Sequence, residues 1–162
     1  MLPGCGYTTS SLLPAKYRTI YIPPFKNNIT YVAEGPRGLY IPLLESRARE
    51  KIVDRFLFNG SLRIAKSEDT ADMILKGELT GFDRQDLRLT DSQEVQEYRL
   101  QITVSLTMLD PDKPEPLWTE SSFTGEATYF TTGPEARSES AALEDALTDL
   151  ARRVVERTVE VW

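Results

Sequence analysis

The residue with the clearest capacity for chemistry is Cys5, the only cysteine of the 162-residue chain. A small residue, Gly4, stands directly before it, and an aliphatic residue, Leu2, stands two positions before the glycine. This spacing resembles a bacterial lipobox, in which the cysteine thiol takes a diacylglyceryl group and becomes the mature N-terminus. Each buried acyl methylene then contributes about 0.8 kcal/mol to membrane attachment. We therefore predict lipid attachment at Cys5, with a free terminal cysteine as the alternative.

The rest of the composition disfavours an enzyme. The chain has no histidine, which removes the commonest general base and the commonest zinc ligand. It also has no nucleophile elbow and no Gly-rich phosphate loop. A single cysteine excludes an intramolecular disulfide. We expect a protein with no catalytic residues, no metal and no cofactor.

Two groups of carboxylates leave one alternative open. Asp83, Asp86 and Asp91 surround an expected turn, and Asp110 and Asp112 flank a proline. Paired acids could bind calcium or perform acid–base chemistry, but neither group has EF-hand spacing. Acids in turns usually accept hydrogen bonds from nearby backbone N–H groups, and we favour that role here.

Charge and hydropathy narrow the class of protein further. The net charge is −6 and the isoelectric point is about 4.8. A nucleic-acid groove needs a concentrated basic face, so we expect no nucleic-acid partner. No run of about 18 apolar residues occurs, so no transmembrane helix is expected. We expect a tether over residues 1–17, with Met1 an added or trimmed start rather than part of a native signal, and one domain over 18–162.

The order of elements predicts an α+β fold. Strands are expected over 18–22, 62–66, 71–82, 98–108 and 117–130, and helices over 42–59 and from 134–140 to about 159. The first strand, the first helix and the second strand should form a right-handed parallel unit, followed by an antiparallel meander. This β-α-β-β-β-β-α order predicts a mixed sheet of four or five strands with both helices packed on one face.

The segment 98–108 is the clearest strand, because apolar and polar residues alternate along it without exception. Its apolar residues should face the helices. Its polar residues should form the opposite face of the sheet, which must meet water or a polar partner: Arg99, Gln101, Thr103 and Ser105.

At this point the chain resembles the LptE family, the outer-membrane lipoproteins of lipopolysaccharide assembly. The start Cys5-Gly6-Tyr7 is similar to the family's cysteine-glycine-aromatic start. The segment 97–104 resembles its most recognisable strand, and it closes in Leu109-Asp110-Pro111. Tyr129-Phe130 then precede an acidic helix start. The resemblance covers nearly all of residues 5–160.

The resemblance implies a structural and binding role. A family member sits as a plug inside an LptD-type β-barrel, assists the assembly of that barrel and contacts lipopolysaccharide. It is anchored at the periplasmic face of the outer membrane of a Gram-negative bacterium. The polar face described above would then lie against the hydrophilic barrel wall.

Two arginines are candidate contacts for the lipopolysaccharide phosphates, because guanidinium groups bind phosphate well. One basic position of the family carries over to Arg137. The other aligns near Asp91, and the nearest basic residue is Arg88, so this sequence departs from the family there. Solvated surface arginines are the alternative at both positions. For Arg99, a cross-strand charge partner is favoured over a ligand contact.

A second function fits the same pattern. Small α/β lipoproteins with a strand–helix–strand start also serve as periplasmic accessory subunits of other envelope transport or secretion complexes. Fold alone does not separate the two roles. The irregular segment 25–40 is a further candidate for partner binding in either case.

Overall fold

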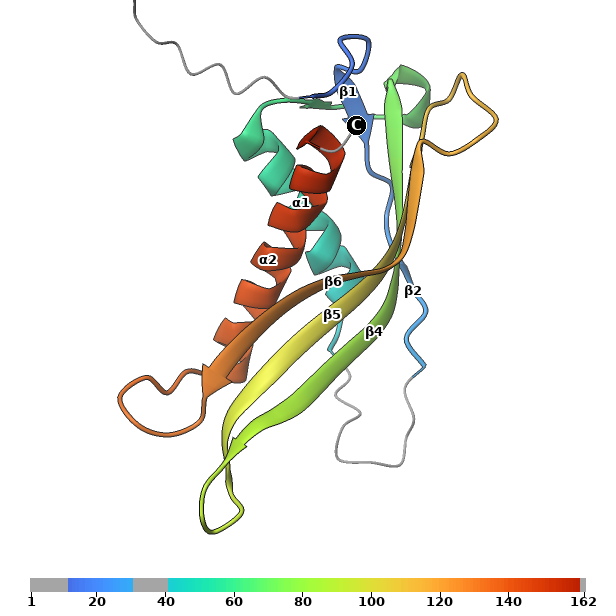
Figure 1. Ribbon diagram of the computed structural model, residues 1–162. Coiled ribbons are helices and arrows are strands. Elements are labelled where there is room, and N and C mark those ends of the chain that lie inside the picture. Colours follow the sequence, from blue (N-terminus) through green and yellow to red (C-terminus); the bar gives the residue numbers. More distant parts are fainter. Residues whose placement is uncertain (1–11, 31–40, 161–162) are drawn as a thin grey trace, which may run out of the picture.

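The computed structural model describes residues 12–30 and 41–160 (Figure 1). Its elements are β1 (Thr19–Tyr21), β2 (Lys26–Asn27), α1 (Leu44–Asn59), β3 (Arg63–Ile64), η1 (Glu68–Thr70), β4 (Met73–Leu89), β5 (Val95–Leu109), β6 (Trp118–Phe130) and α2 (Glu139–Glu160). Both helices of the described residues lie on the same face of a strongly curved sheet (Figure 1). The expected α+β class and the expected placement of the helices are confirmed.

The sheet is mixed and follows the strand order β3-β1-β4-β5-β6, with β2 beside β4. β1 runs parallel to β3 and β4, and β2 also runs parallel to β4. β4, β5 and β6 form an antiparallel meander. The described residues thus form six strands rather than the expected four or five. The missed strand is β2, which is two residues long and therefore shows no periodicity.

β4 is the element whose length differs most from expectation. The sequence predicts a strand that ends at Phe82, whereas β4 continues to Leu89. Residues 83–89 are largely charged, so their sequence carries little strand signal, but the long partner β5 supplies hydrogen bonds along them. The resulting β4–β5 hairpin projects beyond α2 (Figure 1).

Helix α1 packs through residues at four-residue spacing, as expected. Leu44, Ala48, Ile52 and Phe56 are all fully buried. Gly60 ends the helix with a φ of 75° and donates its N–H to the Phe56 carbonyl at 2.9 Å. The start differs slightly from expectation, because Pro42 lies in a turn before the helix rather than in its first turn.

Helix α2 lies directly on β6, and Gly125 makes this possible. A Cβ atom at Gly125 would stand 2.6 Å from the Ala146 carbonyl oxygen, too close for any side chain. Residues at helical spacing along α2, a pattern that predicts one buried face, are all buried: Leu143, Ala146, Leu147, Leu150, Ala151, Val154 and Thr158.

Glycines inside a strand predict a bulge or a close backbone contact, and the two other strand glycines, Gly77 and Gly81, show one of each. The ring of Phe25 lies over Gly77, within 2.6 Å of where its Cβ would be. The register of β4 against β5 shifts between Leu79 and Gly81, which is the expected bulge.

No described helix is both long enough and apolar enough to cross a membrane.

Candidate interaction surface

The sheet has an open face, the side away from α1 and α2. Leu100, Ile102 and Val104 of β5 are fully buried on the helix side. The alternating residues between and beside them are half-buried on the open face, where the sequence placed them: Arg99, Gln101, Thr103 and Ser105. Whether a barrel wall covers these residues stays a prediction.

Arg99 has no charged residue directly opposite it on either neighbouring strand. Its direct cross-strand neighbours are Gln85 on β4 and Thr128 on β6, and both are neutral. The Nε atom of Arg99 is buried and has no hydrogen-bond partner among the described residues. The expectation of a cross-strand charge partner is therefore wrong at the directly opposite positions.

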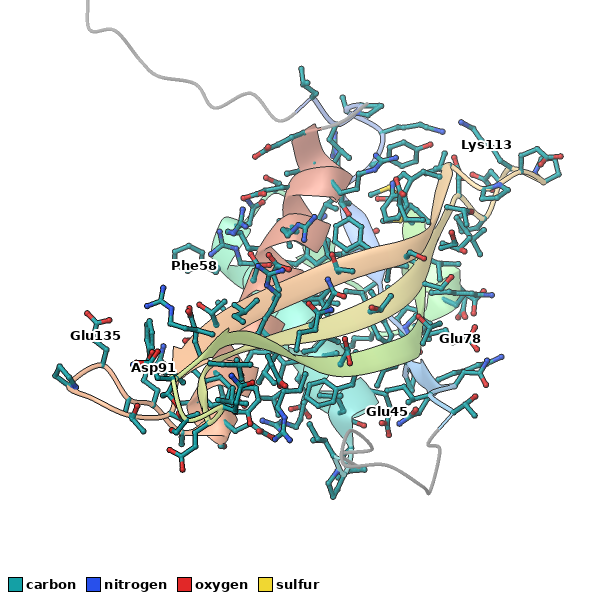
Figure 2. The ribbon with its side chains drawn as sticks, turned by 60° about the horizontal axis from the view of Figure 1, so that its bottom comes forward. Glu45, Phe58, Glu78, Asp91, Lys113 and Glu135 are labelled. Carbon is teal, nitrogen blue, oxygen red and sulfur yellow. The ribbon has the colours of Figure 1, made fainter. Side chains whose placement is uncertain are left out.

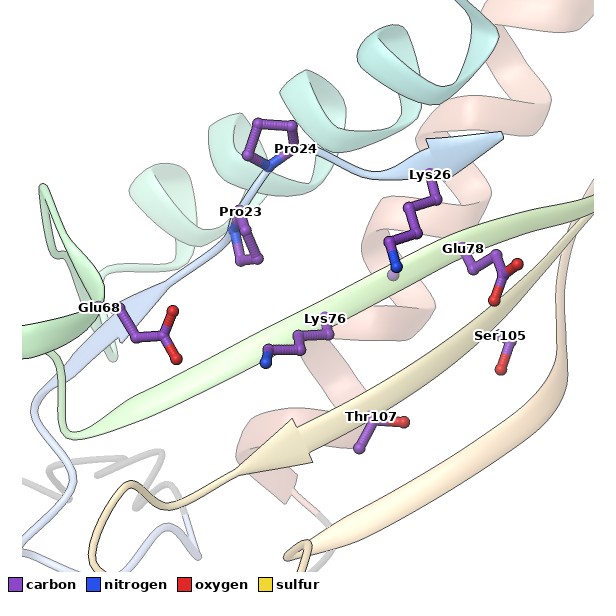
Figure 3. Close-up of a pocket in the computed structure, with 9 residues that line it drawn as sticks. Pro23, Pro24, Lys26, Glu68, Lys76, Glu78, Ser105 and Thr107 are labelled. Atoms are coloured by element: carbon purple, nitrogen blue, oxygen red, sulfur yellow. The ribbon is translucent and has the colours of Figure 1, made fainter. Parts of the chain in front are cut away.

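A hollow of about 390 Å³ lies on the open face beside β2 (Figure 3). Lys26 and Lys76 carry its positive charge, Glu68 and Glu78 its negative charge, and Ser105 adds a hydroxyl. Both signs of charge are thus present in one shallow, polar depression.

The hairpin end of the molecule comprises the β4–β5 turn (residues 90–94) and the β6–α2 loop (residues 131–138). Asp91 of the turn and Glu135 of the loop lie at this end, whereas Lys113 lies at the opposite end (Figure 2). The structure brings the two candidate lipopolysaccharide contacts together here, because Arg88 precedes the turn and Arg137 closes the loop.

Phe130 connects these two arginines. The Arg88 guanidinium lies 5.8 Å from the centre of the Phe130 ring. The backbone N–H of Arg137 donates to the Phe130 carbonyl at 2.9 Å. Each side chain is about half exposed or more and has one carboxylate partner: Glu97 lies 3.8 Å from Arg88, and Asp145 pairs with Arg137. Both guanidinium groups therefore remain accessible.

A second cluster at the hairpin end escaped the sequence analysis. Arg84 Nη1 donates to Glu139 Oε2 at 2.7 Å, and the Tyr129 hydroxyl donates to the same oxygen at 2.8 Å. The Arg84 guanidinium also lies 4.8 Å from the centre of the Tyr98 ring, which stacks on Tyr129. Burial and the hydrogen bond to Glu139 raise the pKa of Tyr129, and the bond to Glu139 raises the pKa of Arg84.

The opposite end carries the attachment of the N-terminal segment. Asp110 is buried and accepts hydrogen bonds from Lys16 Nζ at 2.9 Å and the Tyr17 hydroxyl at 2.8 Å. Its other oxygen accepts the Asp112 N–H at 3.0 Å, which is the turn role expected for these acids. The Lys16 ammonium, followed by the Asp112 N–H, lowers the pKa of Asp110 to about 2. Asp110 thus ties the start of the domain to the end of β5.

No group of three or more metal-ligating side chains occurs among residues 12–30 and 41–160. Cys5, Trp162 and most of the segment 25–40 lie outside the described residues.

A comparison with protein families decides the relationship of the chain. The model of the LptE family, described as lipopolysaccharide-assembly, matches residues 17–158. The chain belongs to the LptE family. The resemblance noted from the sequence is therefore confirmed, and the chain is a member of a lipopolysaccharide-assembly family. None of the curated protein sequences matches it.

Solved structures share the fold at low sequence identity. An uncharacterized lipoprotein B from Nitrosomonas europaea has a TM-score of 0.58 at 12% identity, covering 88% of this chain and 83% of its own. A hypothetical protein from Chlamydia trachomatis has a TM-score of 0.55 at 13% identity, covering 87% and 95%. The PelC dodecamer from Paraburkholderia phytofirmans has a TM-score of 0.53 at 15% identity, covering 95% and 96%. These likenesses concern the fold alone.

Proposed function

We propose that this LptE-family chain is a lipid-anchored, non-catalytic component of the outer-membrane lipopolysaccharide translocon. In this role it plugs an LptD-type β-barrel, assists the assembly of that barrel and contacts lipopolysaccharide. A lipid on Cys5 would hold it at the periplasmic face of the outer membrane. The observation that carries the proposal is the family match over residues 17–158.

The open face supports the barrel contact. Barrels of the outer membrane have polar interiors, so a plug needs a polar surface rather than an apolar one. The open face presents arginine, glutamine, threonine and serine along β5, with Thr124 and Glu126 of β6 beside them. A polar surface of this kind can exchange its bound water for hydrogen bonds to a polar wall.

The hairpin end supports the contact with lipopolysaccharide. The ion pair of Arg137 with Asp145 is exposed, and exposed ion pairs contribute only about 0–1 kcal/mol. A phosphate group can therefore displace Asp145 at little cost. Arg88 is itself 60% exposed, so a phosphate can reach it while Glu97, which is mostly buried, stays in place. A lipopolysaccharide that carries phosphates would gain two charge-assisted contacts at one end of the protein.

The decisive experiment is purification of the full-length, lipidated protein from detergent-solubilised outer membranes, with mass spectrometry of its partners. We expect a large β-barrel at a stoichiometric ratio. Purification alone, or with an inner-membrane transporter or a secretin, would contradict the proposal and favour an accessory role in another envelope complex.

The matched control for anchoring is Cys5→Ser, which keeps a nucleophilic oxygen but lacks the thiol that is lipidated. We expect this variant to lose the acyl mass and to leave the membrane fraction. An unmodified wild-type Cys5 in the same experiment would contradict the lipid anchor without touching the barrel contact.

A further inference from the structure

Within residues 12–30 and 41–160, the distal part of β4 has an edge that no other strand covers. β1 and β2 pair with β4 only as far as Leu79, while β5 covers the other edge as far as Leu89. From Gly81 to Leu89, no described strand lies on the side of β4 away from β5. This stretch contains no proline, so every residue keeps its backbone N–H.

The register identifies the backbone groups that face this edge. The carbonyls of Gln96 and Met108 accept the N–H groups of Thr131 and Leu117, so even-numbered residues of β5 bond to the β6 side. Odd-numbered residues of β5 therefore bond to β4, because the two directions alternate in an antiparallel sheet. The β4 residues opposite even-numbered positions must then direct their N–H and C=O groups outward: Phe82, Arg84 and Asp86.

By contrast, α2 provides hydrogen-bond partners for backbone groups along the other long edge of the sheet, which is formed by β6. Arg153 of α2 donates to the Thr124 carbonyl, and Asp149 of α2 accepts the Glu126 N–H at 3.1 Å. The helix thus satisfies outward backbone groups of β6. The outward groups of Phe82, Arg84 and Asp86 have no such partner among the described residues. A free strand edge of this length is a template for another strand.

The side chains along the edge indicate the chemistry of the occupant. Asp83 and Asp86 form no ion pair with a described residue, whereas the arginines beside them are paired: Arg84 with Glu139 and Arg88 with Glu97. The unpaired charges beside the edge are two aspartates against one arginine, Arg99 opposite Gln85, so their sum is negative. Leu87 and Leu89 add exposed apolar surface, at 40% and 48% exposure.

A second copy of the chain fits this edge poorly. A symmetric antiparallel pairing would bring the unpaired aspartates of both copies, Asp83 and Asp86, to one seam, where like charges repel. An extended segment with basic and apolar residues has complementary charge instead.

We propose that the edge of β4 from Phe82 to Asp86 is a strand-addition site for an extended, basic segment of a partner protein. The inference rests on the proposed function, because it assigns that segment to the barrel of the translocon. It goes further by naming backbone hydrogen bonds, rather than the polar open face, as the specific contact.

The first test is hydrogen exchange at residue resolution. In the isolated protein the outward amides of Phe82, Arg84 and Asp86 should exchange fast, while Asp83 and Gln85, bonded to β5, should be protected. In the purified complex with the barrel, we expect the outward amides to slow by at least about tenfold. Protection already present in the isolated protein would overturn the inference, since another part of the chain or a second copy would then occupy the edge.

The second test is a matched pair of variants at Asp86. Asp86→Pro removes the outward N–H, which proline tolerates at an open edge, whereas Asp86→Ala removes the same charge and keeps the N–H. We expect Asp86→Pro to bind the barrel about 2- to 10-fold more weakly than Asp86→Ala, as one lost hydrogen bond predicts. Circular dichroism would check that both variants fold.

The outcomes separate the inference from the proposed function. Strand addition is wrong if the barrel co-purifies equally with both variants and the outward amides still exchange fast in the complex. The proposed function is not contradicted by that result. If no barrel co-purifies with the wild-type protein, the proposed function fails, and the inference fails with it.

Discussion

The Arg88 guanidinium lies 5.8 Å from the centre of the ring of Phe130. Phe130 is the last residue of β6, the strand that leads to the β6–α2 loop. The carbonyl of Phe130 in turn accepts the N–H of Arg137. Two arginines that are 49 positions apart in sequence (137 − 88) therefore lie at the same end of the protein, Arg88 over the Phe130 ring and Arg137 beside Asp145 of α2.

We predict that the double variant Arg88→Gln/Arg137→Gln binds lipopolysaccharide at least about tenfold more weakly than the wild-type protein, because a hydrogen bond to a charged group is worth about 1.5–3 kcal/mol. The Arg137 substitution should change the free energy of unfolding by no more than about 1 kcal/mol, because the Arg137–Asp145 pair is exposed, whereas the Arg88 substitution also leaves the mostly buried Glu97 without its ion-pair partner. Binding to purified lipopolysaccharide at fixed salt measures the first effect, and urea unfolding measures the second.

Arg63→Gln provides the control for that experiment. Arg63 is exposed on the short strand β3 and forms no ion pair with a described residue, so Arg63→Gln removes one positive charge, as each of the single variants Arg88→Gln and Arg137→Gln does. An equal loss of binding in Arg63→Gln would show that the overall charge, rather than the hairpin end, attracts lipopolysaccharide.

We predict that Gly125→Ala strongly destabilises the protein. The added methyl group would meet the Ala146 carbonyl oxygen and Leu150 Cα, each 2.6 Å away on the backbone of α2, so the helix would have to move off β6. Overpacking of this kind costs about 1–3 kcal/mol. The matched control is Gly81→Ala, where the nearest atom, Thr103 Cβ, is 3.4 Å away. Comparable urea midpoints for the two variants would contradict this account of the α2–β6 contact.

The sequence was most informative where periodicity is strong. The alternation from Tyr98 to Met108 predicts both the strand and its two faces, and the four-residue spacing of α1 predicts its buried side. Gly77 and Gly81 were also recognised as sites of close approach and bulge. In each case the local sequence pattern and the tertiary packing favour the same backbone conformation.

The features that sequence missed depend on contacts between distant residues. The distal half of β4 forms because β5 lies beside it, not because residues 83–89 favour a strand. Arg84 and Glu139, 55 positions apart, meet only once α2 has packed on the sheet. The Asp110 site likewise needs Lys16 and Tyr17 from the start of the domain. No local signal marks such pairs.

We predict that Asp110 makes stability depend on acid pH. Its pKa in the folded protein is about 2, below the ordinary value of 3.8, because Lys16 and backbone N–H groups hold the carboxylate charged. An acid whose pKa is lower in the folded than in the unfolded protein stabilises the folded state. The full stabilisation is present at pH values above the pKa of the unfolded state, and it is lost as the pH falls through the pKa of the folded state. The free energy of unfolding should therefore decrease between pH about 4 and pH about 2.

The variant Asp110→Asn tests this assignment. It should be less stable near neutral pH, and its free energy of unfolding should fall less steeply over the same acid range. Asp112→Asn, an exposed substitution in the same turn, should keep the wild-type slope. Parallel slopes for wild-type and Asp110→Asn would assign the acid dependence to other carboxylates, such as Asp72, whose pKa is lowered by the backbone N–H of Arg18 and by Thr19.

We predict a favourable coupling between Arg84 and Glu139, because their ion pair is the direct link between the β4–β5 hairpin and the start of α2. Each side chain is two-thirds or more buried, so solvent screens the pair less than the exposed ion pair of Arg137 with Asp145. In a double-mutant cycle with Arg84→Met and Glu139→Gln, we expect a coupling energy of about 0.5–3 kcal/mol from urea unfolding. The cycle of Arg152→Met and Glu156→Gln, an exposed pair within α2, should give no more than about 0.5 kcal/mol. Equal coupling in both cycles would mean that the hydrogen bonds between β4 and β5 alone hold the hairpin. Tyr129→Phe, which removes the second hydrogen bond to Glu139, should then leave the free energy of unfolding unchanged as well.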